Sequence, residues 1–132
     1  MEQRKVTTDY ATLQSRWSAA ADDRVRDLEK VYTFRQRELV ITALSEFPFL
    51  ISLVEETYLR IQEFFPGTII FLEPFIDPDN EGHDPADIEL VASIATELEP
   101  REVFERFNEF RQTWWLDALD RAQDRLCVKI GF

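Results

Sequence analysis

The densest group of metal-binding side chains in the chain is a run of alternating carboxylates at Asp77, Asp79 and Glu81. Carboxylates at every second position, followed here by Gly82, resemble the first half of a calcium-binding loop. Such a loop needs a bidentate glutamate at its twelfth position, which here is Ile88. The segment therefore favours a solvated turn, with a metal site at the three carboxylates as the alternative.

Groups that could perform catalysis are sparse. His83 is the only histidine and Cys127 the only cysteine. A zinc site would lack ligands, and a cysteine–histidine pair would require a residue of a polar loop to meet one in the middle of a strand. Three glycines form no phosphate-binding loop, and no serine lies in a glycine-rich elbow. We therefore expect no enzymatic activity and no cofactor.

Trp114 and Trp115 are adjacent in a segment with helical periodicity. Neighbouring residues of a regular helix point about 100° apart, so both indoles cannot face the same core. One ring is expected in the core and the other over a loop or at an interface, where tryptophan is favoured. The alternatives are that both rings are shielded within the monomer, or that they line a ligand pocket.

Three helices are predicted in the first half of the chain. The first covers residues 9–30 and carries Trp17 on a narrow apolar face. It either docks on its own domain or extends as an arm towards a partner. A capping-box spacing that begins at Thr33 predicts a helix over 34–46. A longer apolar stripe predicts a third helix over 49–65.

The second half has strand periodicity on both sides of one further helix. β-branched and aromatic residues predict strands over 68–76 and 87–96. Pro100 suits the start of a helix, and alternation predicts a last strand over 125–132. This order predicts an α+β fold with a three-stranded, mainly antiparallel sheet in the order 2-1-3 and helices on one face. The last helix should bury Val103, Phe104, Phe107, Phe110, Trp114 and Ala118.

A sheet that helices cover on one side has a second face. The residues predicted on this face are Ile70, Leu72, Glu89, Val91, Ser93, Cys127 and Lys129. Faces that are partly apolar often belong to interfaces, and either homodimerisation or docking of the first helix would cover this one. Val91 and Lys129 therefore join Trp17, Trp114 and Trp115 as candidate interaction residues.

The charge is distributed unevenly along the chain. The formal net charge is -11, with a balance of +2 over residues 1–37 and -13 over residues 38–132. Binding to phosphate backbones requires Lys or Arg, so direct nucleic-acid binding by the acidic body is not expected. The acidity either serves solubility or complements a basic protein partner.

Three features of the sequence bear on where in the cell the protein is expected. No apolar run reaches the roughly 18 residues of a membrane span. The first residues, Met-Glu-Gln-Arg-Lys, lack the apolar core of a signal peptide. A single cysteine forms no internal disulfide, which suits a reducing compartment. We therefore expect a cytoplasmic protein with no membrane partner.

Several short segments occur together in the last hundred residues: Phe47-Pro48-Phe49-Leu50, Phe65-Pro66, Asp77-Pro78, Pro100-Arg-Glu and Trp114-Trp115-Leu116-Asp117. With them the chain resembles a family of small uncharacterised bacterial proteins that are common in cyanobacteria. The resemblance covers about residues 31–132, and the Trp-Trp-Leu-Asp segment is its most specific part. It implies no catalytic or binding residue, because the family has no established activity.

These observations predict a helical extension over residues 1–30 and a single α+β domain over 31–132. The expected function is that of a non-catalytic interaction or regulatory protein, antitoxin-like, that binds a basic protein or a second copy of itself. The alternative is a domain that binds a small ligand or a metal, through the acidic loop 77–89 or a pocket lined by Trp114 and Trp115.

Overall fold

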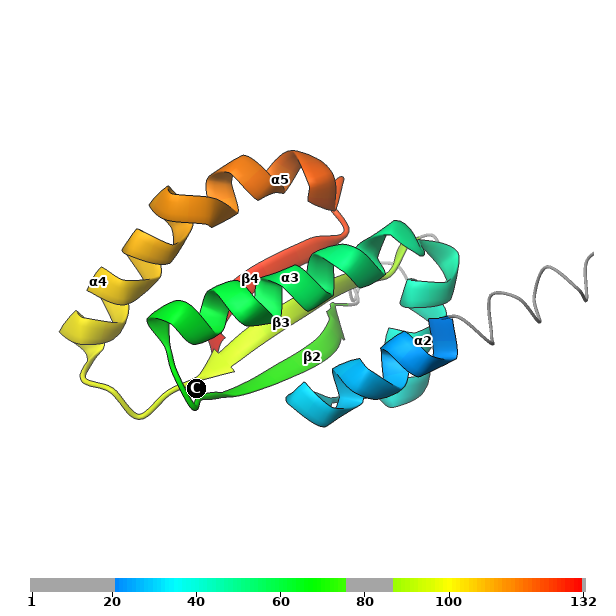
Figure 1. Ribbon diagram of the computed structural model, residues 1–132, viewed down its shortest axis with the longest axis horizontal. Helices are drawn as coiled ribbons and strands as arrows, with labels where there is room; N and C mark the ends of the chain where they lie inside the picture. The colour runs from blue at the N-terminus through cyan, green and yellow to red at the C-terminus, as the bar shows by residue number, and fades with distance from the viewer. Residues whose placement is uncertain (1–20, 76–86, 132) are drawn as a thin grey trace, which may run out of the picture.

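The computed structural model of the protein describes residues 21–75 and 87–131 (Figure 1). These residues form an α+β fold, as the sequence predicts. None of the described helices is both long and apolar enough to cross a membrane. After a helix over 21–31, the elements are β1 (Tyr32–Phe34), α2 (Arg37–Glu46), α3 (Phe49–Phe64), β2 (Ile69–Phe75), β3 (Glu89–Ala95), α4 (Pro100–Phe110), a π-helical turn (Arg111–Trp115), α5 (Leu116–Ala122) and β4 (Leu126–Gly131).

The described sheet is mixed and has four strands in the order β1-β2-β3-β4. β1 is parallel to β2, β2 is antiparallel to β3, and β3 is parallel to β4. The predicted three-stranded, mainly antiparallel sheet with the order 2-1-3 is therefore wrong. The last strand instead lies beside β3 and parallel to it, and the crossover through α4 and α5 connects these two neighbouring strands.

The prediction also missed β1, because Thr33 has the spacing of a helix cap. In the structure Thr33 pairs with Phe71 in the ladder between β1 and β2. The N-cap of α2 is Gln36, whose φ of 51° is left-handed, and its side chain makes no capping hydrogen bond. A three-residue strand shows little periodicity of its own, so its pairing with β2 is a tertiary effect.

The core lies between the sheet and its helices, and it includes buried residues of α2, α3, α4 and α5 (Figure 1). Ile70 and Leu72 of β2 are fully buried and pair with Ile94 and Ala92 of β3. The prediction that Ile70 and Leu72 lie on the opposite face is therefore wrong. Apolar residues occur at both alternating sets of positions in β2, and only Glu73 indicates which set faces solvent.

The π-helical turn changes which residues the last helix buries. Phe110 is fully buried and Trp115, five residues later, is 4% exposed, whereas Trp114 is only partly buried. A π turn inserts one extra residue, so positions five apart share a face across it. The predicted buried stripe is also wrong at Phe104, which lies before the π turn and is 74% exposed. It is confirmed at Val103, Phe110 and Ala118, all of which are buried.

The helix over 21–31 packs on the domain that follows it. Its apolar residues Ala21, Val25 and Leu28 are buried in the common core. Arg24 adds polar contacts to α3, where its Nη2 donates to Ser52 Oγ at 2.9 Å and its Nε donates to Glu55 at 3.2 Å. The predicted remainder of this helix, including Trp17, lies outside the described residues.

Candidate functional site

The second face of the sheet is the candidate site, and strand register determines its residues. One row runs from edge to edge through Thr33, Phe71, Ser93 and Lys129, which pair in succession across the four strands. Alternation places a matching set at every second position along each strand. We call this surface the outer sheet face, and its strand residues are Thr33, Ile69, Phe71, Glu73, Phe75, Glu89, Val91, Ser93, Ala95, Cys127, Lys129 and Gly131. Arg35, directly after β1, belongs to it through its contacts with Phe71 and Glu73.

Charged side chains on this face are arranged around Glu73. Its carboxylate lies 3.0 Å from Arg35 Nη1 and 3.9 Å from Lys129 Nζ, and its side chain is 18% exposed. The Arg35 guanidinium also lies over the ring of Phe71, 3.7 Å from its centroid, at cation–π distance. With Glu89 of β3, the outer sheet face carries two cations and two carboxylates, so it is electrically balanced.

The centre of the outer sheet face is closely packed. Val91 and Ser93 of β3 are buried there although they point away from the core. Ser93 lies against Gly131 of the neighbouring strand, and a Cβ built at Gly131 would fall 2.0 Å from Ser93 Oγ. The absence of a side chain at position 131 therefore makes room for Ser93.

Gly131→Ala is accordingly expected to lower the free energy of unfolding by about 1–3 kcal/mol, because the new methyl group displaces Ser93 in a packed row. Urea denaturation measures this loss. Ser93→Gly removes the side chain that the methyl group meets, and this variant alone provides the baseline because glycine weakens a strand by itself. In the Ser93→Gly background, Gly131→Ala should cost much less than in the unchanged protein, and an equal cost in both backgrounds would contradict this assignment of the close approach.

Large apolar side chains lie towards the two ends of β2 on the outer sheet face. Ile69 is 59% exposed and Phe75 is 53% exposed. Between them lie the partly buried ring of Phe71 and the charges at Glu73. Solvent-exposed apolar groups around a balanced polar centre are typical of a surface that another protein covers.

The structure places the residues predicted as sites in three regions. Val91 and Lys129 lie together on the outer sheet face, in adjacent strands. Trp114 and Trp115 lie in the helical layer instead, with their ring centroids 5.8 Å apart and both rings against Phe110. The remaining predicted site residues lie outside the described part of the chain: Trp17, Asp77, Asp79 and Glu81.

Within residues 21–75 and 87–131, no group of three or more His, Cys, Asp or Glu side chains could hold a metal ion. Most of the acidic loop 77–89 lies outside these ranges. The alternative of a metal site at that loop therefore stays a prediction.

Sequence reasoning missed much of the outer sheet face, including Arg35 and the β2 residues Ile69, Phe71, Glu73 and Phe75. Arg35 follows a strand that was not predicted. Phe71 and Glu73 were assigned to the wrong side when Ile70 and Leu72 were placed outside. The charge at Glu73 was the available signal, because alternation from a charged residue places Phe71 on the same solvent-facing side.

Comparison of the chain with protein-family models, curated proteins and solved structures found no match. The geometry and charge of the outer sheet face are therefore the basis for a functional proposal.

Proposed function

We propose that this chain is a non-catalytic, cytoplasmic interaction protein that associates with a second copy of itself through the outer sheet face. The observation that carries the proposal is the charge balance of a partly apolar face on a chain with a net charge of -11. Two strongly acidic molecules repel each other over most of their surfaces. They approach at the lowest electrostatic cost through the surface where cations and carboxylates cancel.

The composition of the outer sheet face favours a second copy over a basic partner. A basic protein gains most from carboxylates that have no cation beside them. On this face Glu73 already has Arg35 and Lys129 as neighbours. In a pair related by a two-fold axis, the same surface meets itself, so cations of one copy can face the carboxylates of the other.

The dimensions of the sheet set the strength of this association. Four strands spaced about 4.8 Å apart span about 19 Å, and seven residues of β2 span about 23 Å. The footprint of about 400 Å² is half of the roughly 800 Å² that each partner of a standard interface buries. We therefore expect a weak, reversible dimer whose population depends on protein concentration.

Sedimentation velocity over a concentration series tests the proposal. The double variant Ile69→Asp with Phe75→Asp places charges at both exposed apolar ends of β2, and it should remain monomeric where the unchanged protein dimerises. Both positions are more than half exposed, so the fold should persist. The matched control is Leu59→Asp with Phe104→Asp, two exposed apolar positions on α3 and α4, which adds the same charge.

The control should dimerise as the unchanged protein does. Equal sedimentation of both double variants and the unchanged protein would overturn the proposal.

The salt dependence of association distinguishes a second copy from a basic partner. Salt screens the repulsion between like-charged copies, so the dimer should strengthen between about 0.05 M and 0.5 M salt. Complex formation that occurs only with an added basic protein and weakens with salt would favour the basic partner.

A further inference from the structure

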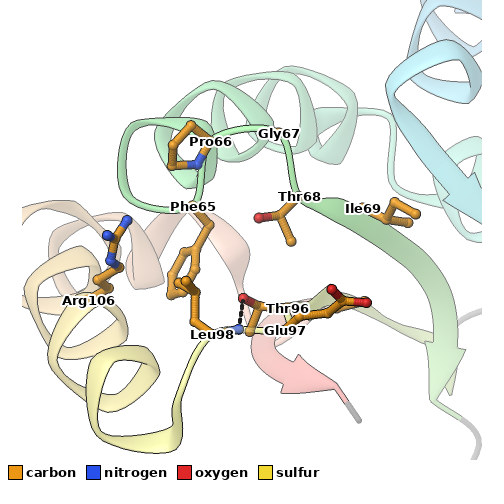
Figure 2. A pocket seen from close by; sticks show the side chains of 10 residues that line it. Phe65, Pro66, Gly67, Thr68, Ile69, Thr96, Glu97, Leu98 and Arg106 are labelled. Atoms are coloured by element: carbon orange, nitrogen blue, oxygen red, sulfur yellow. Dashed lines mark hydrogen bonds between the residues drawn. The ribbon is translucent and has the colours of Figure 1, made fainter.

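A cavity of about 560 Å³ lies at one end of the sheet, away from the centre of the outer sheet face (Figure 2). Two chain segments form it: residues 65–69, which connect α3 to β2, and residues 95–98, which follow β3. Arg106 of α4 closes one side. This volume falls within the range of pockets that hold small organic molecules.

The wall of the cavity is partly apolar. The Phe65 side chain is buried, and the Leu98 side chain is partly buried and packs against the core. Figure 2 shows both side chains between Arg106 on one side and the two threonines, Thr68 and Thr96, on the other. The cavity can therefore cover the apolar body of a small molecule while polar groups contact one end of it.

Arg106 offers no free positive charge to a ligand. Its Nη2 donates to Glu102 at 2.6 Å, and its Nη1 donates to the backbone carbonyl of Phe64 at 3.0 Å. The guanidinium is thus neutralised by one carboxylate and held by the last turn of α3. The positive charge that a ligand carboxylate or phosphate would need is therefore already offset by Glu102.

The polar groups that remain free favour a cation. Thr96 Oγ1 accepts a hydrogen bond from the Leu98 backbone N–H at 3.2 Å and keeps a lone pair. Within the described residues, the Glu97 carboxylate makes no ion pair and no hydrogen bond to a side chain or backbone. The C-terminal end of α3, at Phe65, adds the negative end of a helix dipole.

From this arrangement we infer that the cavity binds a small organic amine, with its apolar body against Phe65 and Leu98 and its ammonium group at Glu97 and the threonine hydroxyls. An ammonium group has three donors and no acceptor, which matches a carboxylate and hydroxyl oxygens. The inference does not require self-association: the cavity shares Ile69 and Ala95 with the outer sheet face, but the groups that would hold the ammonium, Glu97 and the two threonine hydroxyls, lie outside that face.

Isothermal titration calorimetry with three probes of similar size and shape tests the inference. The probes are cationic 2-phenylethylamine, neutral 2-phenylethanol and anionic phenylacetate. The amine should bind about tenfold more tightly than the alcohol, because a charged hydrogen bond replaces a neutral one. Phenylacetate should show no binding. Equal affinity for all three probes, or tighter binding of phenylacetate, would overturn the assignment.

Glu97→Gln is the decisive variant, and Glu99→Gln is its matched control. Glu97 lines the cavity and Glu99 does not, while both are exposed and lie two residues apart. Glu97→Gln should weaken amine binding about tenfold and leave alcohol binding unchanged, whereas Glu99→Gln should change amine binding less than twofold. An equal loss of amine affinity in both variants would show that the general negative charge of the protein attracts the amine. It would overturn the assignment of the ammonium group to Glu97.

Discussion

Phe110→Ala is expected to lower the free energy of unfolding by about 3–5 kcal/mol, which is a large share of the roughly 5–15 kcal/mol of a typical domain. Phe110 is fully buried at the centre of an aromatic cluster. Its ring centroid lies 5.9 Å from Phe64, 5.9 Å from Phe107 and 6.4 Å from Trp115. Removal of the ring leaves a cavity that these neighbours fill only in part. Urea denaturation followed by circular dichroism measures the loss.

Phe104→Ala provides the matched control on the same helix. Phe104 is a phenylalanine of α4 that is 74% exposed, so the same substitution removes few buried contacts. Its effect on the free energy of unfolding should stay within about 0.5 kcal/mol. Equal losses from Phe104→Ala and Phe110→Ala would contradict the difference in burial between these two positions of α4.

The protein is expected to lose stability steeply above pH 10 because of Tyr32. Its phenol is buried in the core and donates a hydrogen bond to the Val54 carbonyl at 2.9 Å. Burial, with a smaller contribution from Tyr58, raises the pKa of Tyr32 well above its ordinary value of about 10. Unfolding exposes the phenol and returns its pKa to that value.

The sign of the pH effect follows from this raised pKa. Below pH 10 the phenol is neutral in both states, and its full contribution to stability is present. Above pH 10 the unfolded state loses the proton first, so stability falls by up to about 1.4 kcal/mol per pH unit, or about 2.7 kcal/mol by pH 12. Urea denaturation at pH 8, 10, 11 and 12 measures the slope.

Tyr32→Phe is the control for this slope. It removes the hydrogen bond to Val54, which should cost about 0.5–1.5 kcal/mol at pH 8. The variant should nevertheless lose less stability than the unchanged protein between pH 10 and pH 12, because it lacks the buried phenol. Identical slopes for the two proteins would show that Tyr32 is not responsible.

Much of the fold could be predicted from local periodicity. The stripe of Leu50, Leu53, Val54 and Ile61 predicts α3 almost to its ends, and those residues are buried. Alternation around Leu90 and Val128 predicts β3 and β4 with the correct inward faces. These patterns succeed because each element buries one face of its own, so a single stretch of sequence contains the whole signal.

The errors occur where distant segments decide the structure. β1 exists because the short segment Tyr32–Phe34 pairs with β2, and the Arg35 backbone N–H extends that pairing by donating to the Leu72 carbonyl at 3.0 Å. The π turn reverses the expected roles of Trp114 and Trp115, since residue spacing alone assumes a regular helix. Both errors affect the outer sheet face. Its charged centre combines Arg35, which follows the unpredicted strand β1, with Glu73 of β2, whose two faces were exchanged in the prediction.

The proposed pair of outer sheet faces has a geometric consequence for assembly size. An isologous contact uses the same patch on both molecules, so neither molecule keeps a free copy of that patch after pairing. Growth therefore stops at two, in contrast to strand addition at a sheet edge, which leaves a new edge each time and propagates into fibres. At the β1 end the edge strand is only three residues long, which makes it a poor template for such propagation.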